Sequence, residues 1–364
     1  MDENLLELWW TGVEAVRGDV CVRRALQQSP YPAPDQIIAV GKAASAMARA
    51  ACAHWPGVPT LIVTKYDHAA DAPAGARVIE AAHPVPDAQS IAAGAALRTA
   101  VANCGAHTHL LMLVSGGASA LAEALPKGDS LDRLQADTQT LLASGANIAE
   151  LNTFRRERSL IKGGKLLSGF SGARVTTLAL SDVEGDSLGV IGSGIGDAPS
   201  DAQYVFEARI VASNAIARQA IVNATQNKVM VNEETLYDDV MTLALQIGQS
   251  LRDGAPGLYI FGGEPVVQLP ANPGLGGRNM ALAALIAREI AGLGGVEVLV
   301  AGTDGTDGPT DAAGAQVDGQ TWHHSAEEAL ARADIYPWLK SNGALLVTGP
   351  TGTNVMDVVI AQKR

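Results

Sequence analysis

The feature that most constrains the fold of this chain is an alternation between short apolar runs and longer stretches rich in Ala and Leu. The apolar runs have the length and composition of β-strands, at residues 36–40, 60–64, 77–81, 109–114, 175–180, 258–261, 296–301 and 345–348. The longer stretches have helical composition, at residues 43–53, 87–103, 131–144, 148–161 and 280–291. Alternation of this kind is typical of a mainly parallel sheet covered by helices, so the sequence predicts the α/β class.

The length of the chain favours two domains, because 364 residues are more than one domain usually contains. An acidic stretch at 233–252, which we expect to be helical, separates the earlier strands from the later ones. We therefore predict a first domain over residues 1–230 and a second over residues 231–364, with the boundary somewhere within 213–256.

Glycine and polar residues follow most of the predicted strands directly. These loops are GKAAS at 41–45, KYDH at 65–68, AHPVPD at 82–87, SGGAS at 115–119, SDVEGD at 181–186 and GTDGTDG at 302–308. Open α/β sheets bind their ligands at the carboxyl ends of their strands. The sequence therefore predicts a ligand site built from these loops.

The loop at 115–119 is a candidate for binding a phosphate or a carboxylate. Its small residues, Ser115, Gly116, Gly117 and Ser119, would let backbone N–H groups approach an anion at the start of a helix. The alternative is a tight turn that needs glycine for its backbone angles. Lys42 also lies where a helix is expected to begin, although an exposed surface lysine is the commoner explanation.

A cationic stripe is expected on the predicted helix at 148–161. Asn152, Arg155, Arg156 and Ser159 are spaced to share one side of that helix, within a run of basic residues that also includes Arg158, Lys162 and Lys165. Such a stripe would concentrate an anionic ligand locally, even though the whole chain carries a net charge of −12. A solvated charged face is the alternative.

Carboxylates follow two of the predicted strands. Asp182 and Asp186 could hold Mg²⁺ beside phosphates, since that ion usually takes one or two protein carboxylates. An Asp that caps the next turn is the alternative. In the later part of the chain, Asp304 and Asp307 lie in the glycine-rich loop at 302–311, where hydrogen-bonded turns are the alternative.

A second group of glycine motifs surrounds Glu264 and Arg278. Glu264 ends the sequence GGE, and Arg278 belongs to a glycine turn directly before a predicted helix. That position suits a planar guanidinium aimed at phosphate or carboxylate oxygens.

The composition excludes several classes of protein. The net charge of −12 argues against nucleic-acid binding, and no apolar run approaches the roughly 18 residues of a membrane helix. The three cysteines are far apart in the sequence, which favours a reducing compartment, so we expect a cytoplasmic protein. A Walker A motif is absent, as is GxGxxG after the first strand, so a nucleotide site here is neither a P-loop nor the usual dinucleotide site.

The ordered set of motifs resembles one family, the glycerate 2-kinases with a C-terminal multi-organism fragment rich in leucine. The matching motifs run almost from end to end: GKAA at 41–44, TKY at 64–66, HPVPD at 83–87, SGG at 115–117, SGA at 144–146, NT at 152–153, IKGG at 161–164, SDV at 181–183, GGE at 262–264, GGRN at 276–279 and GPTGTN at 349–354. Departures are Asp67 for a usual Gly, Ile195-Gly196 for Pro-Thr, and Pro265-Val266 for two Thr.

This resemblance implies a kinase that uses ATP and Mg²⁺ to convert D-glycerate to 2-phospho-D-glycerate. It also implies a Rossmann-like N-terminal domain that faces a smaller α/β domain, with the active site in the cleft between them. Lys42 and Arg278 would face each other there as the leading catalytic residues.

On this hypothesis each predicted site residue has a role. Lys42 and Arg278 neutralise charge on the transferred phosphoryl group, and either Asp182 or Asp186 holds Mg²⁺ or accepts the hydroxyl proton, a choice that stays open. The 115–119 loop receives an anion, and Asn152 and Arg155 orient glycerate. Glu264 binds substrate or nucleotide from the second domain, and Asp304 and Asp307 contact the nucleotide or a metal ion there.

Two other functions are alternatives. An NAD(P)H-dependent hydroxypyruvate reductase would need a dinucleotide motif that the sequence lacks. A non-catalytic protein that binds a sugar acid would not need Lys42, Arg278 and the paired aspartates. In each case the partners are small molecules, with neither nucleic acid nor a membrane involved, and both a monomer and a dimer remain open.

Overall fold

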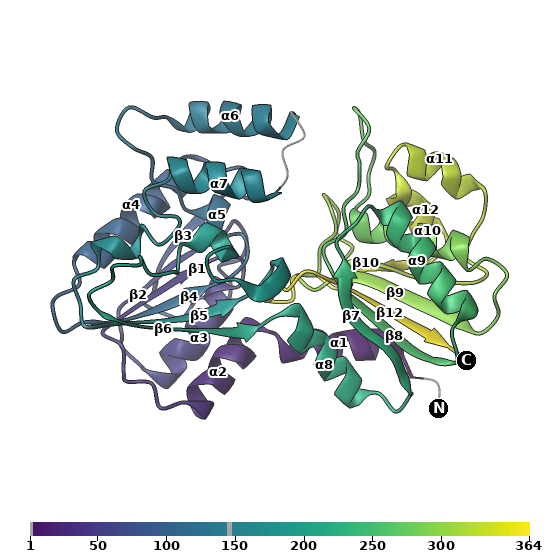
Figure 1. The fold of residues 1–364 in the computed structure, drawn as a ribbon, viewed down its shortest axis with the longest axis horizontal. Helices are drawn as coiled ribbons and strands as arrows, with labels where there is room; N and C mark the ends of the chain where they lie inside the picture. Colours follow the sequence, from purple (N-terminus) through teal and green to yellow (C-terminus); the bar gives the residue numbers. More distant parts are fainter. Residues whose placement is uncertain (1–2, 144–147) are drawn as a thin grey trace. The chain divides into compact units, whose positions relative to one another are not determined.

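A computed structural model describes residues 3–143 and 148–364 of the chain, and the side chains of residues 139, 141–143 and 148–152 lie outside that description. The chain forms two compact units (Figure 1). One unit is Arg17–Ser213, and the other combines Met1–Val16 with Asn214–Arg364.

The unit over Arg17–Ser213 contains a six-stranded sheet in the order β3-β2-β1-β4-β5-β6, with every neighbouring pair parallel. Its strands are β1 (Gln36–Val40), β2 (Thr60–Lys65), β3 (Arg77–Ala81), β4 (His109–Val114), β5 (Arg174–Leu180) and β6 (Val205–Ala212). Strand order reverses between β1 and β4, which is the place where doubly wound sheets bind ligands. The predicted α/β class and the Rossmann-like arrangement are confirmed.

Helices cover both faces of this sheet. They are α2 (Gly18–Gln28), α3 (Ala44–His54), α4 (Ala88–Ala102), α5 (Ala118–Leu121), α6 (Leu131–Ala143) and α7 (Ile148–Arg158). Figure 1 shows α2 and α3 on one face and α4 and α5 on the other. Every residue of β4 is buried, because a strand covered on both faces needs a continuous apolar run. The strands predicted at 36–40, 60–64, 77–81, 109–114 and 175–180 are confirmed to within one residue at each end.

The second unit contains a mixed six-stranded sheet in the order β11-β10-β9-β12-β8-β7. Its strands are β7 (Val229–Leu236), β8 (Gly257–Gly263), β9 (Val296–Gly302), β10 (Gly314–Asp318), β11 (Leu345–Leu346) and β12 (Asp357–Lys363). Only β7 and β8 are parallel among its described pairs. The last strand, β12, lies between β9 and β8 and brings the end of the chain into the middle of the sheet.

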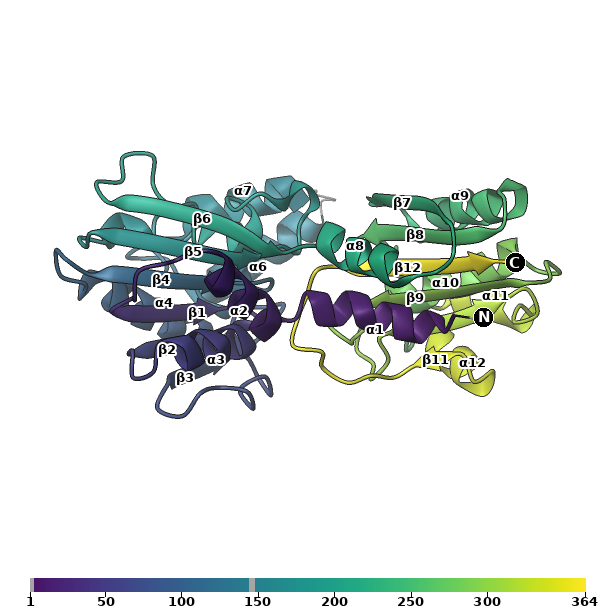
Figure 2. The same cartoon turned by 90° about the horizontal axis from the view of Figure 1, so that it is seen from below.

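Helices also pack on both faces of the second sheet. They are α1 (Leu5–Ala15), α8 (Asn214–Ala224), α9 (Val240–Asp253), α10 (Arg278–Glu289), α11 (Ser325–Ala331) and α12 (Ile335–Ser341). The helices α9 and α10 share a core with one face of the sheet. Figure 2 shows α1 and α8 side by side, and Trp9 of α1 and Ile221 of α8 share a second core with Ile260 and Leu299.

Because α1 and α8 bury their apolar faces in this second core, they belong to the unit that contains residues 229–364. The compact units therefore differ from the predicted segments 1–230 and 231–364 at two places, the first 16 residues and residues 214–230. The chain leaves this unit after Val16 and returns to it at Asn214.

Two predicted elements are corrected by the structure. The stretch at 233–252 is not one helix, because residues up to Leu236 form β7 and pair with β8, and α9 begins only at Val240. The strand predicted at 345–348 is reduced to Leu345–Leu346, which pairs with β10. None of the helices in the described part of the chain is long and apolar enough to cross a bilayer.

Candidate active site

The loops that follow β1 and β4 are joined by hydrogen bonds at the point where strand order reverses. The backbone N–H of Lys42 donates to the carbonyl of Gly116 at 2.9 Å. The N–H of Ala43 donates to Oγ of Ser115 at 3.0 Å. The two loops that the sequence predicted as separate anion-binding candidates therefore form one structure.

Glycine is required at two positions in this pair of loops. Gly41 has a φ of +128°, and a Cβ there would lie 2.2 Å from Oγ of Ser115. Gly117 has a φ of +84°, and a Cβ there would lie 3.1 Å from Cγ of Lys42 and 3.2 Å from Cδ2 of His83. The missing Cβ at Gly117 thus lets the side chains of Lys42 and His83 lie directly beside the loop.

The backbone of this loop has donors available for an anion. Within the described residues, the N–H groups of Gly116 and Gly117 make no hydrogen bond. Small residues allow a phosphate or carboxylate to approach such groups closely. Ser119, further along, exchanges a hydrogen bond with Ser193 at 2.8 Å between the two Oγ atoms, which fastens the loop to residues 191–194.

Asp182 and Asp186 lie in the loop that follows β5. Both side chains are half-buried, and Asp186 ends a single turn over Glu184–Asp186. In the described part of the chain, no group of three or more His, Cys, Asp or Glu is arranged to hold a metal ion. Two carboxylates in one loop nevertheless fit Mg²⁺, since that ion usually takes one or two carboxylates and completes its shell with phosphates and water.

The cationic stripe predicted on the helix at 148–161 is divided by the structure. The side chain of Asn152 lies outside the described residues, as do residues 144–146 of the SGA motif. Arg155 is half-buried on α7, and burial lowers the pKa of its guanidinium while the nearby Glu123 carboxylate opposes that effect.

In the second unit, Arg278 begins α10 and is held by two carboxylates. Its Nε donates to Oδ2 of Asp357 at 2.7 Å, and its Nη1 donates to Oε1 of Glu264 at 2.6 Å. Burial disfavours the charged guanidinium, but Asp357 and Glu264 outweigh it and raise the pKa of Arg278. Glu264 and Arg278, two of the predicted site residues, are therefore in direct contact, and their roles toward a substrate stay a prediction.

Asp357, which holds the candidate site residue Arg278, was not indicated by the sequence. It begins β12, is 2% exposed, and also accepts a hydrogen bond from the side-chain amide of Asn279 at 3.0 Å. Its role follows from the insertion of β12 beside β8 and β9, because that pairing brings the last strand next to the start of α10. No local motif marks such a residue in the sequence.

Asp307 caps α10 from a neighbouring loop. Its two carboxylate oxygens accept the backbone N–H groups of Asn279 at 3.2 Å and Met280 at 2.8 Å. Gly277, the N-cap residue, has no side chain to do this, and a Cβ there would lie 2.2 Å from the Asp307 carboxyl carbon. Asp307 is 3% exposed, so its carboxylate is engaged with the helix rather than open to solvent.

The stability of this unit should depend on the ionisation of Asp307. Burial raises the pKa of Asp307 to about 7, against the opposing hydrogen bond from Met280. Between about pH 4 and pH 7 the Asp307 carboxyl therefore keeps its proton in the folded protein and releases it in the unfolded chain. The free energy of unfolding is expected to fall as the pH rises through this window, by up to about 4 kcal/mol.

The variant Asp307→Asn tests this expectation, because it has no carboxyl group to titrate. Urea unfolding of both proteins at pH 5 and pH 8 gives the difference between their free energies of unfolding at each pH. The other titrating groups contribute equally to both proteins, so their contributions cancel in this difference. We expect wild type to lose stability relative to Asp307→Asn at the higher pH. A difference that does not change with pH would mean that Asp307 is ionised throughout.

Asp304 belongs to a loop packed against the GPTGTN motif. Its Oδ1 accepts both the N–H and the hydroxyl of Thr306, each at 3.0 Å. A Cβ on Gly305 would lie 2.0 Å from the carbonyl oxygen of Gly349, so the 302–308 loop and the 349–354 loop are in close contact. These two predicted loops form one surface near the carboxyl end of β9.

The departures from the family pattern have structural explanations. Asp67 has a φ of +66°, a left-handed conformation that glycine adopts most easily and that Asp tolerates. Ile195 is fully buried in the core beside α5. Val266 exchanges backbone hydrogen bonds with Asp238 and Val240 and so helps to fix the start of α9.

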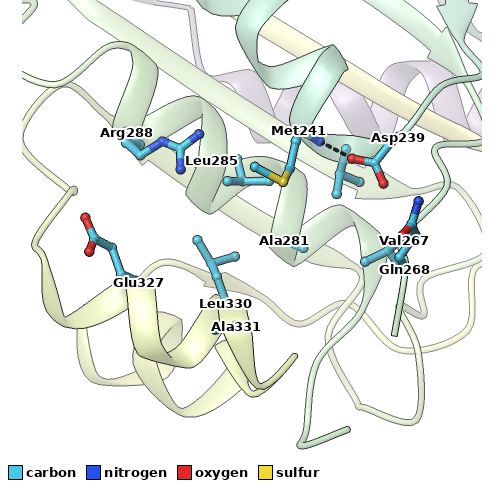
Figure 3. A pocket seen from close by; sticks show the side chains of 11 residues that line it. Asp239, Met241, Val267, Gln268, Ala281, Leu285, Arg288, Glu327, Leu330 and Ala331 are labelled. Carbon is cyan, nitrogen blue, oxygen red and sulfur yellow. Dashed lines mark hydrogen bonds between the residues drawn. The ribbon is translucent and has the colours of Figure 1, made fainter. Parts of the chain in front are cut away.

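A cavity of about 400 Å³ lies between α9, α10 and α11, and none of the predicted site residues lines it (Figure 3). Its floor is apolar, with Met241, Ala281 and Leu285 pointing inward. A smaller cavity of about 150 Å³ shares Ala281 with it and reaches Gly276 and Gly277, directly before Arg278.

The structure thus brings the predicted residues together in two groups. Lys42, Ser115, Gly116 and Gly117 meet in one unit, with Ser119 adjacent, and Glu264, Arg278 and Asp307 meet in the other. The facing of Lys42 and Arg278 across a cleft stays a prediction.

A parallel sheet with glycine-rich loops at its switch point, joined to a mixed sheet that carries a carboxylate-held arginine, is typical of two-domain α/β enzymes that act on anionic substrates. Family models agree with this class. Residues 4–229 match a model described as a domain of unknown function (DUF4147), and residues 257–357 match the MOFRL family.

Known relatives define the family. The D-glycerate 2-kinase of Thermotoga maritima is 36% identical, over 98% of this chain and 96% of its own length. The glycerate 2-kinase of Pyrococcus horikoshii is 34% identical, over 89% of this chain and 86% of its own. A crystal structure of the Thermotoga maritima glycerate kinase matches with a TM-score of 0.86 and 33% identity, covering 99% of this chain and 98% of that one. The chain belongs to the glycerate kinase family.

Proposed function

We propose that this protein is a glycerate 2-kinase, which transfers the γ-phosphoryl group of ATP to the 2-hydroxyl of D-glycerate. The observation that carries the proposal is the pair of joined loops at the switch point, where the side chain of Lys42 passes close to Gly117 and the N–H groups of Gly116 and Gly117 make no hydrogen bond within the described residues. A cation next to unoccupied backbone donors suits an anionic substrate. Membership of the glycerate kinase family names that substrate.

Phosphoryl transfer requires mainly positioning and neutralisation of charge. The 2-hydroxyl oxygen attacks the γ-phosphorus, the bond from that phosphorus to the ADP oxygen breaks, and the hydroxyl proton passes to a carboxylate. Lys42 and Arg278 neutralise the charge on the transferred group. Asp182 or Asp186 accepts the proton or holds Mg²⁺, which when bound would neutralise charge on the phosphate oxygens.

Arg278 is prepared for this role by its partners. Asp357 accepts the N–H of Nε, and Glu264 accepts one N–H of Nη1. In the described part of the chain, Arg278 has no further hydrogen-bond partner. The remaining N–H donors of the planar guanidinium are available to phosphate oxygens in a fixed orientation. Asp357 and Glu264 therefore act as positioning residues.

ATP is the expected phosphoryl donor. The apolar cavities along α10 support a site for its base, because the smaller one reaches Gly276 and Gly277, directly before Arg278. The loops that contain Asp304 and residues 349–354 supply polar groups on the same unit. The proposal also includes that the protein acts on ATP and glycerate in the cytoplasm.

The test incubates purified protein with ATP, MgCl₂ and D-glycerate and measures ADP by chromatography. We expect release of ADP that depends on both glycerate and Mg²⁺, and a product that enolase converts directly to phosphoenolpyruvate, which identifies the 2-phosphate. Chelation of Mg²⁺ with EDTA should abolish turnover.

Two outcomes would contradict the proposal. ADP release that does not depend on glycerate would remove glycerate as the acceptor. Oxidation of NADH or NADPH in the presence of hydroxypyruvate, without kinase activity, would favour the reductase alternative.

A further inference from the structure

Another cavity, of about 220 Å³, lies within the unit that carries Lys42. Its walls come from the segment at 84–86, α5, α6 and α7, and include the apolar residues Pro84, Val85 and Leu134. Three charged side chains also line it: Glu123, Arg155 and Lys162. A small, mostly apolar cavity with a few convergent polar groups is the usual form of a small-molecule site.

The charged pair at the bottom of this cavity is fully buried. Glu123 and Lys162 form an ion pair, and each side chain is 1% exposed. Glu123 also accepts hydrogen bonds from the hydroxyl of Ser159 and the N–H of Ala124. Lys162 has three N–H donors, and within the described residues only Glu123 receives one of them.

Arg155 differs from the other arginines of α7. Arg158 makes ion pairs with Asp129 at 3.1 Å and Asp137 at 2.7 Å, and Arg156 donates to the hydroxyl of Thr153 at 3.1 Å. The guanidinium of Arg155, by contrast, has no hydrogen bond to any residue that the structure describes. It is half-buried on the wall of the cavity, so its donors are available to a ligand there.

The charges of the cavity add up to one positive charge. Arg155 and Lys162 contribute two, and Glu123 removes one; among the described residues that line the cavity, no other is ionisable. A positive charge without a partner in an apolar surrounding is unfavourable, and a bound carboxylate would compensate it with charge-assisted hydrogen bonds. Gln135 uses its amide N–H₂ on the carbonyl of Pro86 at 2.7 Å, which leaves its amide oxygen to accept a bond from a ligand hydroxyl.

We propose that this cavity binds a small hydroxycarboxylate, with its carboxylate on Arg155 and Lys162 and a hydroxyl on Gln135. Ser119 also lines the cavity and links it to the loop of Gly116 and Gly117, where Lys42 lies. The ligand is either glycerate as the substrate, which rests on the proposed function, or a separate carboxylate effector. Both have the same chemistry.

The experiment measures binding by isothermal titration calorimetry, with D-glycerate, D-lactate and glycerol as probes. Glycerol has the hydroxyls of glycerate but no carboxylate. We expect wild type to bind both acids and to bind glycerol much more weakly. Arg155→Gln should weaken binding of the acids by about ten- to a hundredfold, and Arg155→Lys should restore part of it.

Arg156→Gln is the matched control, because it removes a neighbouring arginine that does not line the cavity. It should bind the acids like wild type. Thermal unfolding checks that the Arg155 variants are folded, which we expect because the guanidinium makes no hydrogen bond to any described residue. Equal acid binding by wild type and Arg155→Gln, or absence of acid binding by wild type, overturns the proposal.

Turnover separates the two sources of the ligand. If the KM for glycerate rises in Arg155→Gln by the same factor as its dissociation constant, the cavity is the substrate's carboxylate subsite. If lactate binding weakens while the KM for glycerate is unchanged, the cavity binds an effector. Acid binding in a protein without kinase activity would support the cavity and contradict only the proposed function.

Discussion

Replacing Lys42 by alanine is expected to lower kcat for glycerate phosphorylation by about a hundred- to a thousandfold, with the fold unchanged. The loss follows from removing a positive charge next to the N–H groups of Gly116 and Gly117, where the transferred phosphoryl group or the glycerate anion is expected. The fold should persist because the loop is held by backbone bonds from residues 42 and 43, which alanine keeps. ADP release gives kcat and KM, and thermal unfolding reports on the fold.

The controls separate charge from geometry. Lys42→Arg keeps the charge with a different shape and should recover part of the activity. Lys127→Ala removes an exposed lysine of the same unit and should leave kcat unchanged. A folded Lys42→Ala protein with normal kcat would exclude Lys42 from the transfer step.

The sequence predicted the parallel sheet well because its signal is local. Strands buried on both faces must be almost continuously apolar, and β1 and β4 are apolar after their first residues, Gln36 and His109. The position of the loops at the carboxyl ends of those strands follows from the same pattern. The hydrogen bond from Lys42 to Gly116 could not be predicted, since it depends on which strands become neighbours.

The second unit was harder to predict because the order of strands in its sheet depends on pairing between strands that are far apart in the sequence. Asp357 supports Arg278 only because β12 enters the sheet between β9 and β8. In the sequence it is a single Asp before an apolar run. The helix α1 was missed for the same reason, since its apolar face is buried against strands more than two hundred residues away.

The basic residues in and after the predicted helix at 148–161 differ in their surroundings, which the sequence pattern alone does not reveal. A run of basic residues was expected to be either an anion site or a solvated face, and the structure places its members in different surroundings. Arg158 is paired with two aspartates at the surface, whereas Lys162 is buried against Glu123. The spacing within the helix did not reveal the partner, because Glu123 lies 39 residues earlier in the chain.

This buried pair leads to the largest expected effect on stability. Lys162→Met should destabilise the protein by about 3–5 kcal/mol, because it leaves the Glu123 carboxylate buried without its cation. Burial already lowers the pKa of Lys162, and the attraction to Glu123 opposes that shift, so the charged lysine depends on its partner. Urea unfolding at pH 7 measures the loss, and Lys127→Met should change stability by no more than about 0.5 kcal/mol.

The double variant Lys162→Met with Glu123→Gln distinguishes an unpaired charge from lost packing. If the unpaired carboxylate causes the loss, removing its charge should restore about 1–3 kcal/mol, so the two substitutions will not be additive. Hydrogen bonds from Ser159 and Ala124 can be kept by the glutamine oxygen. A double variant less stable than Lys162→Met would mean that those two donors, rather than Lys162, stabilise the ionised Glu123.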